Sequence, residues 1–318
     1  MRPLAFSVLL TVPAALGAQD VALARACSRL GDARHPDARS VVQQAAQGAG
    51  APADFARGCL AMADRQWATA VGAFERAVAA ADGSAVAHFW LGRAYGEQAQ
   101  RANVLRQASL ARKTKGHFDR AVQIDPEYLD AREGLLQYYL VAPGMLGGSE
   151  EKARAQAEEI RRRDPYRGAF AAARIAARRK AWGEAAREYD GLAAQFPDSA
   201  APWLSLVSIH AQQRRWDEVF RIADRLQRVQ PGSTLALYLA GRAAAETGEQ
   251  LERGDEALTR YLAAQRKPGE PAPANAHWRR GAIRERQGRR DLARADYEAA
   301  LRLDPELKAA REAIARLR

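Results

Sequence analysis

The sequence contains few of the residues on which most enzymes and metal sites depend. Its 318 residues include two cysteines and five histidines. The histidines have neither the spacing of a metal site nor a nearby cluster of partner residues. Neither the G-x-S-x-G turn of a serine hydrolase nor the H-E-x-x-H helix of a zinc protease occurs. We therefore predict that the chain is not an enzyme, with no catalytic residue, no metal and no cofactor.

Long apolar runs are also scarce, and the clearest one lies at the start of the chain. Leu4–Leu16 carries no charged side chain, follows the positive start at Arg2, and leads into small residues that suit a cleavage site. The run is shorter than the roughly 20 residues that span a bilayer. We predict a signal peptide at residues 1–18 and a periplasmic or secreted bacterial protein without an integral membrane segment.

The two cysteines, Cys27 and Cys59, both lie beyond the predicted signal peptide. In an oxidising compartment an even number of cysteines permits a disulfide. The alternative is a pair of small buried residues in successive helices. Lipid attachment at Cys27 is disfavoured, because Arg25 stands where a small or apolar residue is needed and the apolar run is distant.

Lysine is scarce as well, since six of the 49 basic residues are lysine and the others are arginine. The formal net charge is +11. A GC-rich genome or a role for arginine in binding would each explain this bias. No nucleic-acid-binding motif accompanies the charge, and export argues against such a partner, so we expect no nucleic acid.

Val, Ile and Thr are sparse, whereas alanine, leucine, arginine and glutamate dominate, and this composition favours helices. A motif recurs in two halves. The clearest first half is His88-x2-Leu91-Gly92-x2-Tyr95. The second halves are Ala70-x3-Phe74, Ala185-x3-Tyr189 with Pro197, and Ala293-x3-Tyr297 with Pro305. Three tryptophans support the pattern, because each stands three residues before the small or β-branched position of a second half. They are Trp67, Trp182 and Trp216.

This pattern resembles the tetratricopeptide repeat, a helical hairpin of about 34 residues with W-x2-L-G-x2-Y, A-x3-F and a final proline. Units placed end to end cover residues 51–84, 85–128, 129–165, 166–199, 200–233, 234–273 and 274–307. A degenerate hairpin at 19–50 precedes this array, and a capping helix at 308–318 follows it. The resemblance implies an all-α fold, a right-handed α-solenoid of about seven hairpins plus that helix.

Three segments depart from the regular unit. About ten extra residues near 96–117 are basic, and we expect both helices of that hairpin to lengthen. A glycine-rich insertion at 141–149 precedes Ser149, which suits a helix N-cap. Glu150 and Glu151 follow it and would repel phosphate, so a phosphate-binding loop is disfavoured. The proline-rich connector at 267–273 is interpreted as a stiff loop and a weak domain boundary.

In tetratricopeptide arrays the concave inner face comes from the first helix of each unit. We call positions 5, 9 and 13 of these helices the inner face. Position 5 is mostly aromatic here and position 9 is often arginine, so aromatic rings lie one helical turn before guanidinium groups. Such pairs suit acidic and apolar side chains. The predicted partner-binding residues are Phe89, Arg93, Phe170, Arg174, Gln212, Tyr238, Arg242 and Trp278. The alternative for the aromatic residues is burial against the next helix.

These observations predict an exported scaffold or adaptor that binds a protein or peptide on its concave face in the cell envelope. The alternative is an anionic envelope polymer or lipid headgroup, bound through arginine-rich surfaces that include the 101–115 stretch. Salt separates the two, because polymer binding weakens steeply as ionic strength rises.

Overall fold

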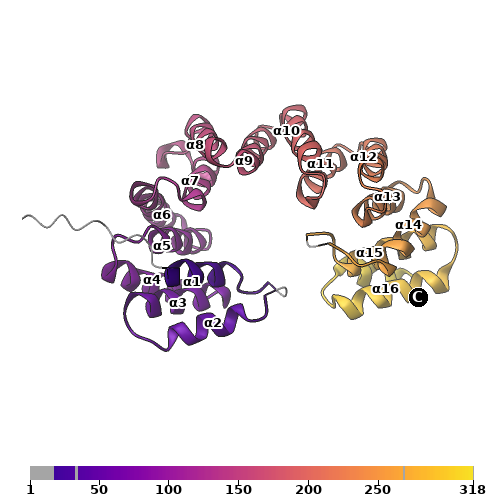
Figure 1. Cartoon of the computed structure of the whole chain (residues 1–318). Coiled ribbons are helices and arrows are strands. Elements are labelled where there is room, and N and C mark those ends of the chain that lie inside the picture. The colour runs from indigo at the N-terminus through magenta and orange to yellow at the C-terminus, as the bar shows by residue number, and fades with distance from the viewer. Residues whose placement is uncertain (1–17, 33–34, 268, 318) are drawn as a thin grey trace, which may run out of the picture. The chain divides into compact units, whose positions relative to one another are not determined.

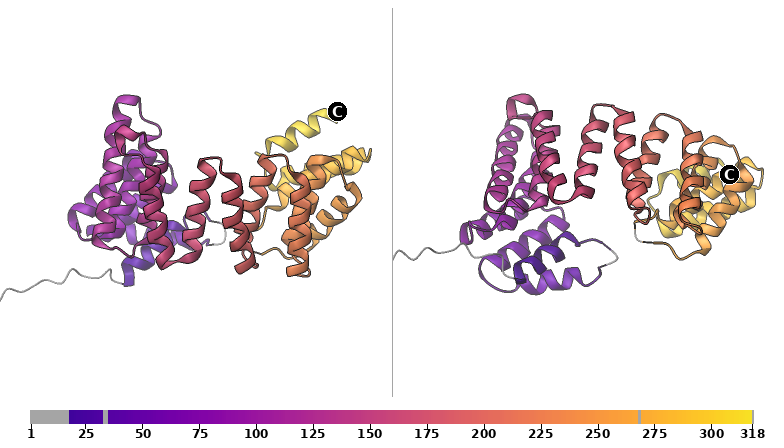
Figure 2. Two further views of the ribbon diagram at one scale, coloured as in Figure 1. Left: turned by 90° about the horizontal axis from the view of Figure 1, so that it is seen from above. Right: turned by 45° about the horizontal axis from the view of Figure 1, so that its top comes forward.

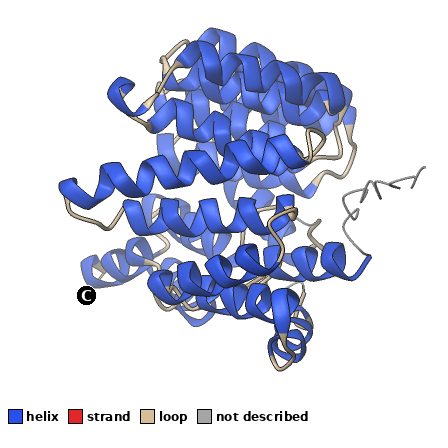
Figure 3. Ribbon diagram, turned by 90° about the vertical axis from the view of Figure 1, so that its left-hand side faces the viewer, coloured by secondary structure: helices blue, strands red, loops and turns tan. Residues whose placement is uncertain are grey.

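The computed structural model describes residues 18–32, 35–267 and 269–317. These residues form 17 α-helices and one short 3-10 turn, with no strand among them (Figure 3). The predicted all-α fold is therefore confirmed. The predicted signal peptide at 1–18 lies almost wholly outside the described residues. Within the described part, no helix combines the length and apolar character needed to cross a bilayer.

The chain divides into two compact units, Met1–Ala171 and Ala172–Arg318. The first contains α1 (Ala18–Ser28), α2 (Ala38–Ala46), α3 (Gly50–Ala63), α4 (Trp67–Ala80), α5 (Ala85–Ala99), α6 (Val104–Ile124), α7 (Leu129–Val141), the turn η1 (Gly144–Leu146) and α8 (Glu150–Arg163). The boundary falls inside α9 (Pro165–Arg178). The second contains α10 (Trp182–Gln195), α11 (Ala200–Gln212), α12 (Trp216–Val229), α13 (Thr234–Thr247), α14 (Leu251–Ala263), α15 (Pro273–Arg286), α16 (Arg290–Leu303) and α17 (Lys308–Arg316).

Successive helices within each unit are antiparallel neighbours (Figures 1 and 2). Glycines on first helices allow this close approach. A Cβ added at Gly281 would lie 2.7 Å from the ring of Tyr297, and one at Gly92 would lie 2.8 Å from the ring of Phe118. Both aromatic residues come from the second helix of the same hairpin and are buried. The small residue of the motif therefore leaves room for a large side chain from the second helix of the same hairpin.

The turn between the two helices of a hairpin also repeats. Its residue 15 has a positive φ in five hairpins, at Arg65, Lys180, Arg214, Gly248 and Gly288, with φ between 56° and 80°. This left-handed conformation costs a non-glycine residue about 1 kcal/mol. The repeat keeps the conformation even where arginine or lysine occupies it, because the packing of the two helices fixes the turn.

The extra residues near 96–117 lengthen only one helix. α6 has 21 residues, whereas α5 has 15. The prediction that both helices lengthen is therefore wrong for α5. The chain turns at Asn103, whose side-chain oxygen accepts a hydrogen bond from the Arg106 amide at 3.1 Å and caps α6. This cap ends the connection early, so the remaining residues continue as α6.

The 141–149 insertion forms a fixed loop around η1. Tyr138 donates a hydrogen bond to the carbonyl oxygen of Leu146 at 2.7 Å. Ser149 caps α8 by accepting from the amide of Lys152 at 3.2 Å, as the sequence predicts. The loop passes so close to α7 that a Cβ at Gly148 would lie 1.8 Å from the carbonyl oxygen of Ala142.

The proline-rich connector is bound to unit 2 and is not a boundary. Tyr261 donates to the carbonyl oxygen of Pro271 at 2.5 Å, and Thr234 donates to Glu270 at 2.7 Å. Lys267 forms a 2.9 Å ion pair with Asp198. These contacts hold the connector against its neighbours, which explains why the compact units divide at residue 171 and not here.

The N-terminal hairpin is covalently attached to the first regular one. Cys27 of α1 and Cys59 of α3 form a disulfide, with Cα atoms 5.4 Å apart. Both side chains are buried. Of the two arrangements that the sequence leaves open, the structure has the bridge.

Candidate interaction surface

The predicted partner-binding residues lie on first helices of successive hairpins. α5 carries Phe89 and Arg93, and α13 carries Tyr238 and Arg242. The other four are Phe170 and Arg174 of α9, Gln212 of α11, and Trp278 of α15. Each of the two compact units presents an inner face of its own.

In unit 1, Arg93 lies over aromatic rings. Its guanidinium carbon is 4.4 Å from the ring centroid of Trp90 and 5.7 Å from that of Phe89. No carboxylate among the described residues lies within ion-pair distance of it. Partial burial lowers the pKa of Arg93, because burial disfavours the charged form. Arg93 is therefore an exposed cation over aromatic rings, which Glu97 and Asp130 influence from a distance but which no carboxylate contacts as an ion pair.

In unit 2, Arg242 repeats this arrangement at the same position of its hairpin. Its guanidinium carbon lies 5.7 Å from the ring centroid of Trp216. Its Nε is buried and has no hydrogen-bond partner. Burial is the main cause that lowers the pKa of Arg242, and the neighbouring charge of Arg279 adds to it. Among the described residues no carboxylate pairs with Arg242 at ion-pair distance.

The aromatic residues of the inner face are too buried to form a continuous exposed surface for a ligand. Phe89 and Tyr238 are buried, with 8% and 4% of their surface exposed. Phe170, which packs its ring 5.1 Å from that of Tyr166, and Trp278 are half-buried. Phe89 packs against Phe118 and Tyr238 against Tyr261, each on the second helix of its own hairpin. Of these four rings, Phe89 also lies beneath an inner-face arginine, Arg93.

The remaining predicted residues differ in their surroundings. Gln212 is exposed and donates a weak hydrogen bond to Ser208 at 3.5 Å. Arg174 is exposed, and its charge acts on Tyr189 of α10. Tyr238 accepts a hydrogen bond from Nε of Arg279 at 3.2 Å. The structure thus brings Tyr238 and Arg242 close to α15, whereas Gln212 stands apart from them.

Trp278 lines a cleft that the sequence pattern did not predict. The cleft has a volume of about 270 Å³ and lies between α13, α15, α16 and α17. Arg279 extends over the ring of Trp278 at 4.6 Å and pairs with Glu246 at 2.6 Å. The charged residues at its rim are Glu246, Arg279, Arg286, Glu312 and Arg316. The cleft requires the capping helix α17, so no single repeat motif could have revealed it.

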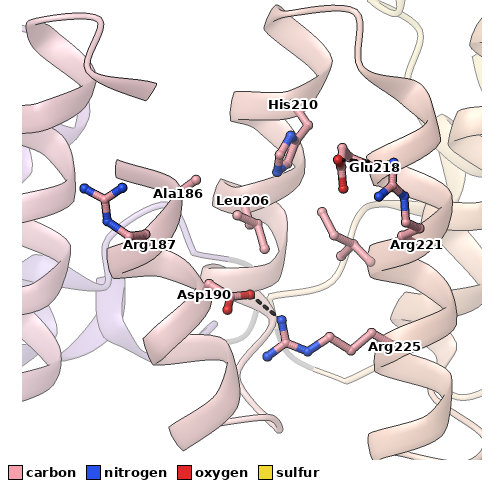
Figure 4. Close-up of a pocket in the computed structure, with 9 residues that line it drawn as sticks. Ala186, Arg187, Asp190, Leu206, His210, Glu218, Arg221 and Arg225 are labelled. Carbon is pink, nitrogen blue, oxygen red and sulfur yellow. Dashed lines mark hydrogen bonds and ion pairs between the residues drawn. The ribbon is translucent and has the colours of Figure 1, made fainter. Parts of the chain in front are cut away.

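A second cleft of about 310 Å³ lies between α10, α11 and α12 (Figure 4). Arg225 forms an ion pair with Asp190 across it, and Arg221 pairs with Asp217 at 2.6 Å. His210 lines the cleft, and its buried Nδ1 has no hydrogen-bond partner. Burial lowers the pKa of His210 and keeps the ring neutral near pH 7. Two of the three arginines that line the cleft are already paired with carboxylates, which leaves little free positive charge for a ligand.

Sequence comparison identifies the repeat. Residues 274–307 match the family model described as tetratricopeptide repeat. The last hairpin of the array therefore carries a tetratricopeptide repeat. The match covers the hairpin of α15 and α16, in which Gly281, Tyr297 and Pro305 stand at the motif positions. No curated protein matches the sequence significantly.

One solved structure with a similar fold supports the tetratricopeptide architecture. Yeast Tom70 has a TM-score of 0.58 at 11% identity, over 94% of this chain and 74% of Tom70. A tetratricopeptide repeat protein from Parabacteroides merdae ATCC 43184 has a TM-score of 0.49 at 13% identity, over 84% of this chain and 98% of that one. At such identity the likeness to Tom70 shows the fold and nothing about partners.

Two histidines meet across a hairpin, a pairing that the sequence spacing did not predict. The Nδ1 atoms of His88 and His117 lie 3.0 Å apart between α5 and α6. Nε2 of His88 lies 3.0 Å from the carbonyl oxygen of Asp82, which can only accept. His88 therefore donates through Nε2, and its Nδ1 accepts from Nδ1 of His117. Burial is the main cause that lowers the pKa of His117 to about 4.

His277 also has a partner, the buried carboxylate of Asp296. Its Nδ1 lies 2.9 Å from that carboxylate, which accepts from Arg280 at 2.6 Å and from Arg284 at 2.9 Å. Burial opposes the charge of Asp296. The hydrogen bonds from His277 and Arg280 prevail and hold the pKa of Asp296 below its usual value. The cluster joins α15 to α16 and is fully paired, so its role is structural.

Clusters suited to metal binding are absent from the described residues, where no group of three or more His, Cys, Asp or Glu side chains converges. His88 and His117 meet as a pair only.

Proposed function

We propose that this tetratricopeptide protein is an exported scaffold that binds an acidic, partly apolar peptide segment of a protein partner on its inner face. Proteins built from this repeat are in general scaffolds and not enzymes. The proposal adds a location, the cell envelope, and a chemistry for the partner, carboxylates flanked by apolar side chains.

The proposal rests mainly on the similar surroundings of Arg93 and Arg242. Both occupy position 9 of a first helix, both lie over a tryptophan ring, and neither has a carboxylate partner among the described residues. By contrast, the inner-face carboxylates Glu97 and Glu246 are paired, with Arg101 and Arg279. A partly desolvated guanidinium without a counter-ion binds a carboxylate favourably, because much of its desolvation cost is already met within the fold.

The aromatic neighbours favour a peptide over a small inorganic anion. The guanidinium groups of Arg93 and Arg242 lie over Trp90 and Trp216, and guanidinium N–H groups can donate hydrogen bonds to a carboxylate. In unit 2, half-buried Trp278 adds apolar surface close to Tyr238 and Arg279. A peptide with alternating acidic and apolar side chains satisfies both kinds of group.

Two features support export to the periplasm or beyond. The apolar run Leu4–Leu16 with a basic start has the form of a signal peptide. The disulfide between Cys27 and Cys59 agrees with an oxidising compartment, where such bonds persist. Fractionation of cells that express the chain with a C-terminal epitope tests this directly. Recovery of the chain in the cytoplasm with residues 1–18 intact would contradict it.

Photo-cross-linking in intact cells tests the binding surface. A photoreactive amino acid replaces Glu97, which lies one helical turn beyond Arg93 on the same helix face. We expect defined protein adducts from this position that disappear when Arg93→Gln is added. The matched control carries the same group at exposed Glu298 of α16. Adducts that persist unchanged with Arg93→Gln, or that form equally from position 298, would refute an inner-face site.

A further inference from the structure

The N-terminal hairpin lacks the large side chains that fill the regular hairpins. In the hairpin of α3 and α4, the fully buried ring of Phe74 packs so close to Gly58 that a Cβ there would lie 2.5 Å from it. Between Ala18 and Asp54, a stretch that includes α1 and α2, the sequence contains no phenylalanine, tyrosine or tryptophan. Small side chains cannot fill the space that a ring fills elsewhere, so this hairpin leaves room between its helices.

A cleft of about 430 Å³ lies between α1 and α2, at the N-terminal end of unit 1 (Figure 1). It is larger than the two clefts of unit 2 described above. Four apolar side chains line it, Ala22 and Ala26 from α1 and Ala38 and Val41 from α2. Val41 is 47% exposed. Clefts of this size with an apolar wall and a few polar groups are typical of small-molecule sites.

The lining residues of α1 form one stripe of the helix. Ala22, Arg25, Ala26 and Arg29 follow one another at spacings that keep their side chains on one face, within about 100° of one another. The stripe is about 10 Å long, which is similar to an extended chain of about eight carbons. Two guanidinium groups and two methyl groups therefore line the cleft from the same helix.

The two arginines bring charge that the fold does not neutralise. Arg25 and Arg29 are exposed, and neither forms an ion pair with a carboxylate of the described residues. Asp37 is the one carboxylate among the lining residues, and it is exposed too. Two arginines and one aspartate give the lining a formal charge of +1, without counting His35. The ring of His35 adds a nitrogen that can take part in a hydrogen bond.

Covalent and packing contacts fix both walls of the cleft. Cys27, the neighbour of Ala26, is bridged to Cys59 of α3, and both cysteines are buried. On the opposite wall, Val42 is fully buried beside exposed Val41 and anchors α2. The cleft is therefore formed before any ligand enters, which lowers the entropic cost of binding.

We propose that this cleft binds a single-chain amphiphile with a monoanionic head, either a carboxylate or a phosphodiester. The head accepts hydrogen bonds from Arg25 and Arg29, and the chain lies against the apolar wall that Ala26, Ala38 and Val41 help to form. The formal charge of the lining matches one such head. A small inorganic anion would leave the apolar wall in water, whereas an uncharged apolar molecule would leave both guanidinium groups without a partner.

Isothermal titration calorimetry of the purified chain with four probes tests this proposal. Octanoate and octyl methyl phosphate carry the same chain with the two kinds of head, octanol carries the chain alone, and acetate carries a head alone. We expect one anionic amphiphile per chain, with a dissociation constant on the order of 0.1 mM. Octanol and acetate should bind at least about tenfold more weakly. The tighter of the two amphiphiles identifies the head that the cleft prefers.

Variants of the lining residues locate the bound amphiphile. Arg25→Gln with Arg29→Gln should weaken the tighter amphiphile by at least about tenfold and leave octanol unchanged. Val41→Ser should weaken both the amphiphile and octanol by about fivefold, because it removes apolar surface from the wall. These three side chains are exposed, so the variants should fold as the wild-type chain does, which circular dichroism checks.

Matched controls remove the same groups from unit 2. Arg228→Gln with Arg302→Gln changes two exposed arginines, and Val229→Ser changes a valine that is 51% exposed. Amphiphile binding should be unchanged in both. The proposal would be overturned if neither amphiphile bound, or if octanol or acetate bound as tightly. Equal effects of test and control variants would overturn it as well, because the amphiphile would then lie outside this cleft.

Discussion

At the scale of residues, the important feature is which charges the fold leaves without partners. Arg93 and Arg242 could be selected from the sequence because the repeat motif numbers their position. Their surroundings and their lack of an ion-pair partner could not be predicted from the sequence. These depend on contacts with aromatic rings elsewhere in the fold, such as Trp216 of the preceding hairpin. The pairing of His88 with His117, 29 residues apart, was missed for the same reason. The spacing of residues in the sequence does not show which side chains meet across a hairpin whose second helix is longer than in the regular repeat.

His117 makes stability depend on pH. Its pKa is about 4 in the folded chain and about 6.5 when unfolded. The unfolded chain therefore binds more protons between these values, and stability is lost as pH falls from about 6.5 towards 4. At pH 5 the loss from this group is about 2 kcal/mol. We expect His117→Asn, which retains an N–H donor, to reduce the fall in urea midpoint between pH 7.5 and 5. Parallel pH profiles for the two proteins would count against this assignment.

At the scale of elements, the helical hairpin follows closely from sequence. The described helices fall within the 34-residue register because small and large residues at fixed spacing decide how two helices pack, and turn residues decide where they end. The sequence left the burial of Phe89 and Tyr238 open, because it depends on contacts with rings of the second helix, Phe118 and Tyr261. The length of α5 was mispredicted because the Asn103 cap, a single residue, ends the connection.

Gly281 tests the packing within a hairpin. Replacement by alanine would bring a Cβ within 2.7 Å of the fully buried ring of Tyr297. We expect Gly281→Ala to destabilise the chain by about 1–3 kcal/mol through overpacking. Gly191 in α10 provides the matched control, because a Cβ added there would have no neighbouring helix or side chain within 4 Å. Gly191→Ala should raise stability by about 0.5–1 kcal/mol. Thermal unfolding followed by circular dichroism compares the two, and a gain in stability from Gly281→Ala would contradict the packing account.

At the scale of the whole molecule, the chain consists of two compact units whose boundary lies within α9. The sequence predicts one array, because each hairpin of the repeat resembles the next across residue 171. The sequence also suggested a weak domain boundary at the proline-rich connector. Instead, the ion pair of Lys267 with Asp198 and the hydrogen bond from Tyr261 hold this connector in place. Long-range side-chain contacts of this kind leave no signal in residue spacing.

The disulfide should stabilise unit 1 selectively. Cys27 and Cys59 are 32 residues apart, and closing a loop of that length contributes about 3–4 kcal/mol in the chain-entropy model. We expect Cys27→Ser with Cys59→Ser to lower hydrogen-exchange protection in α1 to α3 and leave α13 to α16 unchanged. Equal loss of protection in both units, or none in α1 to α3, would contradict this expectation.

The central claim is that Arg93 and Arg242 bind carboxylates of a peptide. The most direct measurement is the affinity of dodecapeptides selected from a random display library on the wild-type chain, measured by fluorescence anisotropy. We predict that selected peptides are enriched in Asp or Glu beside apolar residues. Arg93→Gln with Arg242→Gln should weaken them by at least about tenfold, whereas Arg228→Gln with Arg302→Gln, which removes the same charge, should not. Selected peptides without acidic residues, or equal affinity for all three proteins, would contradict the claim.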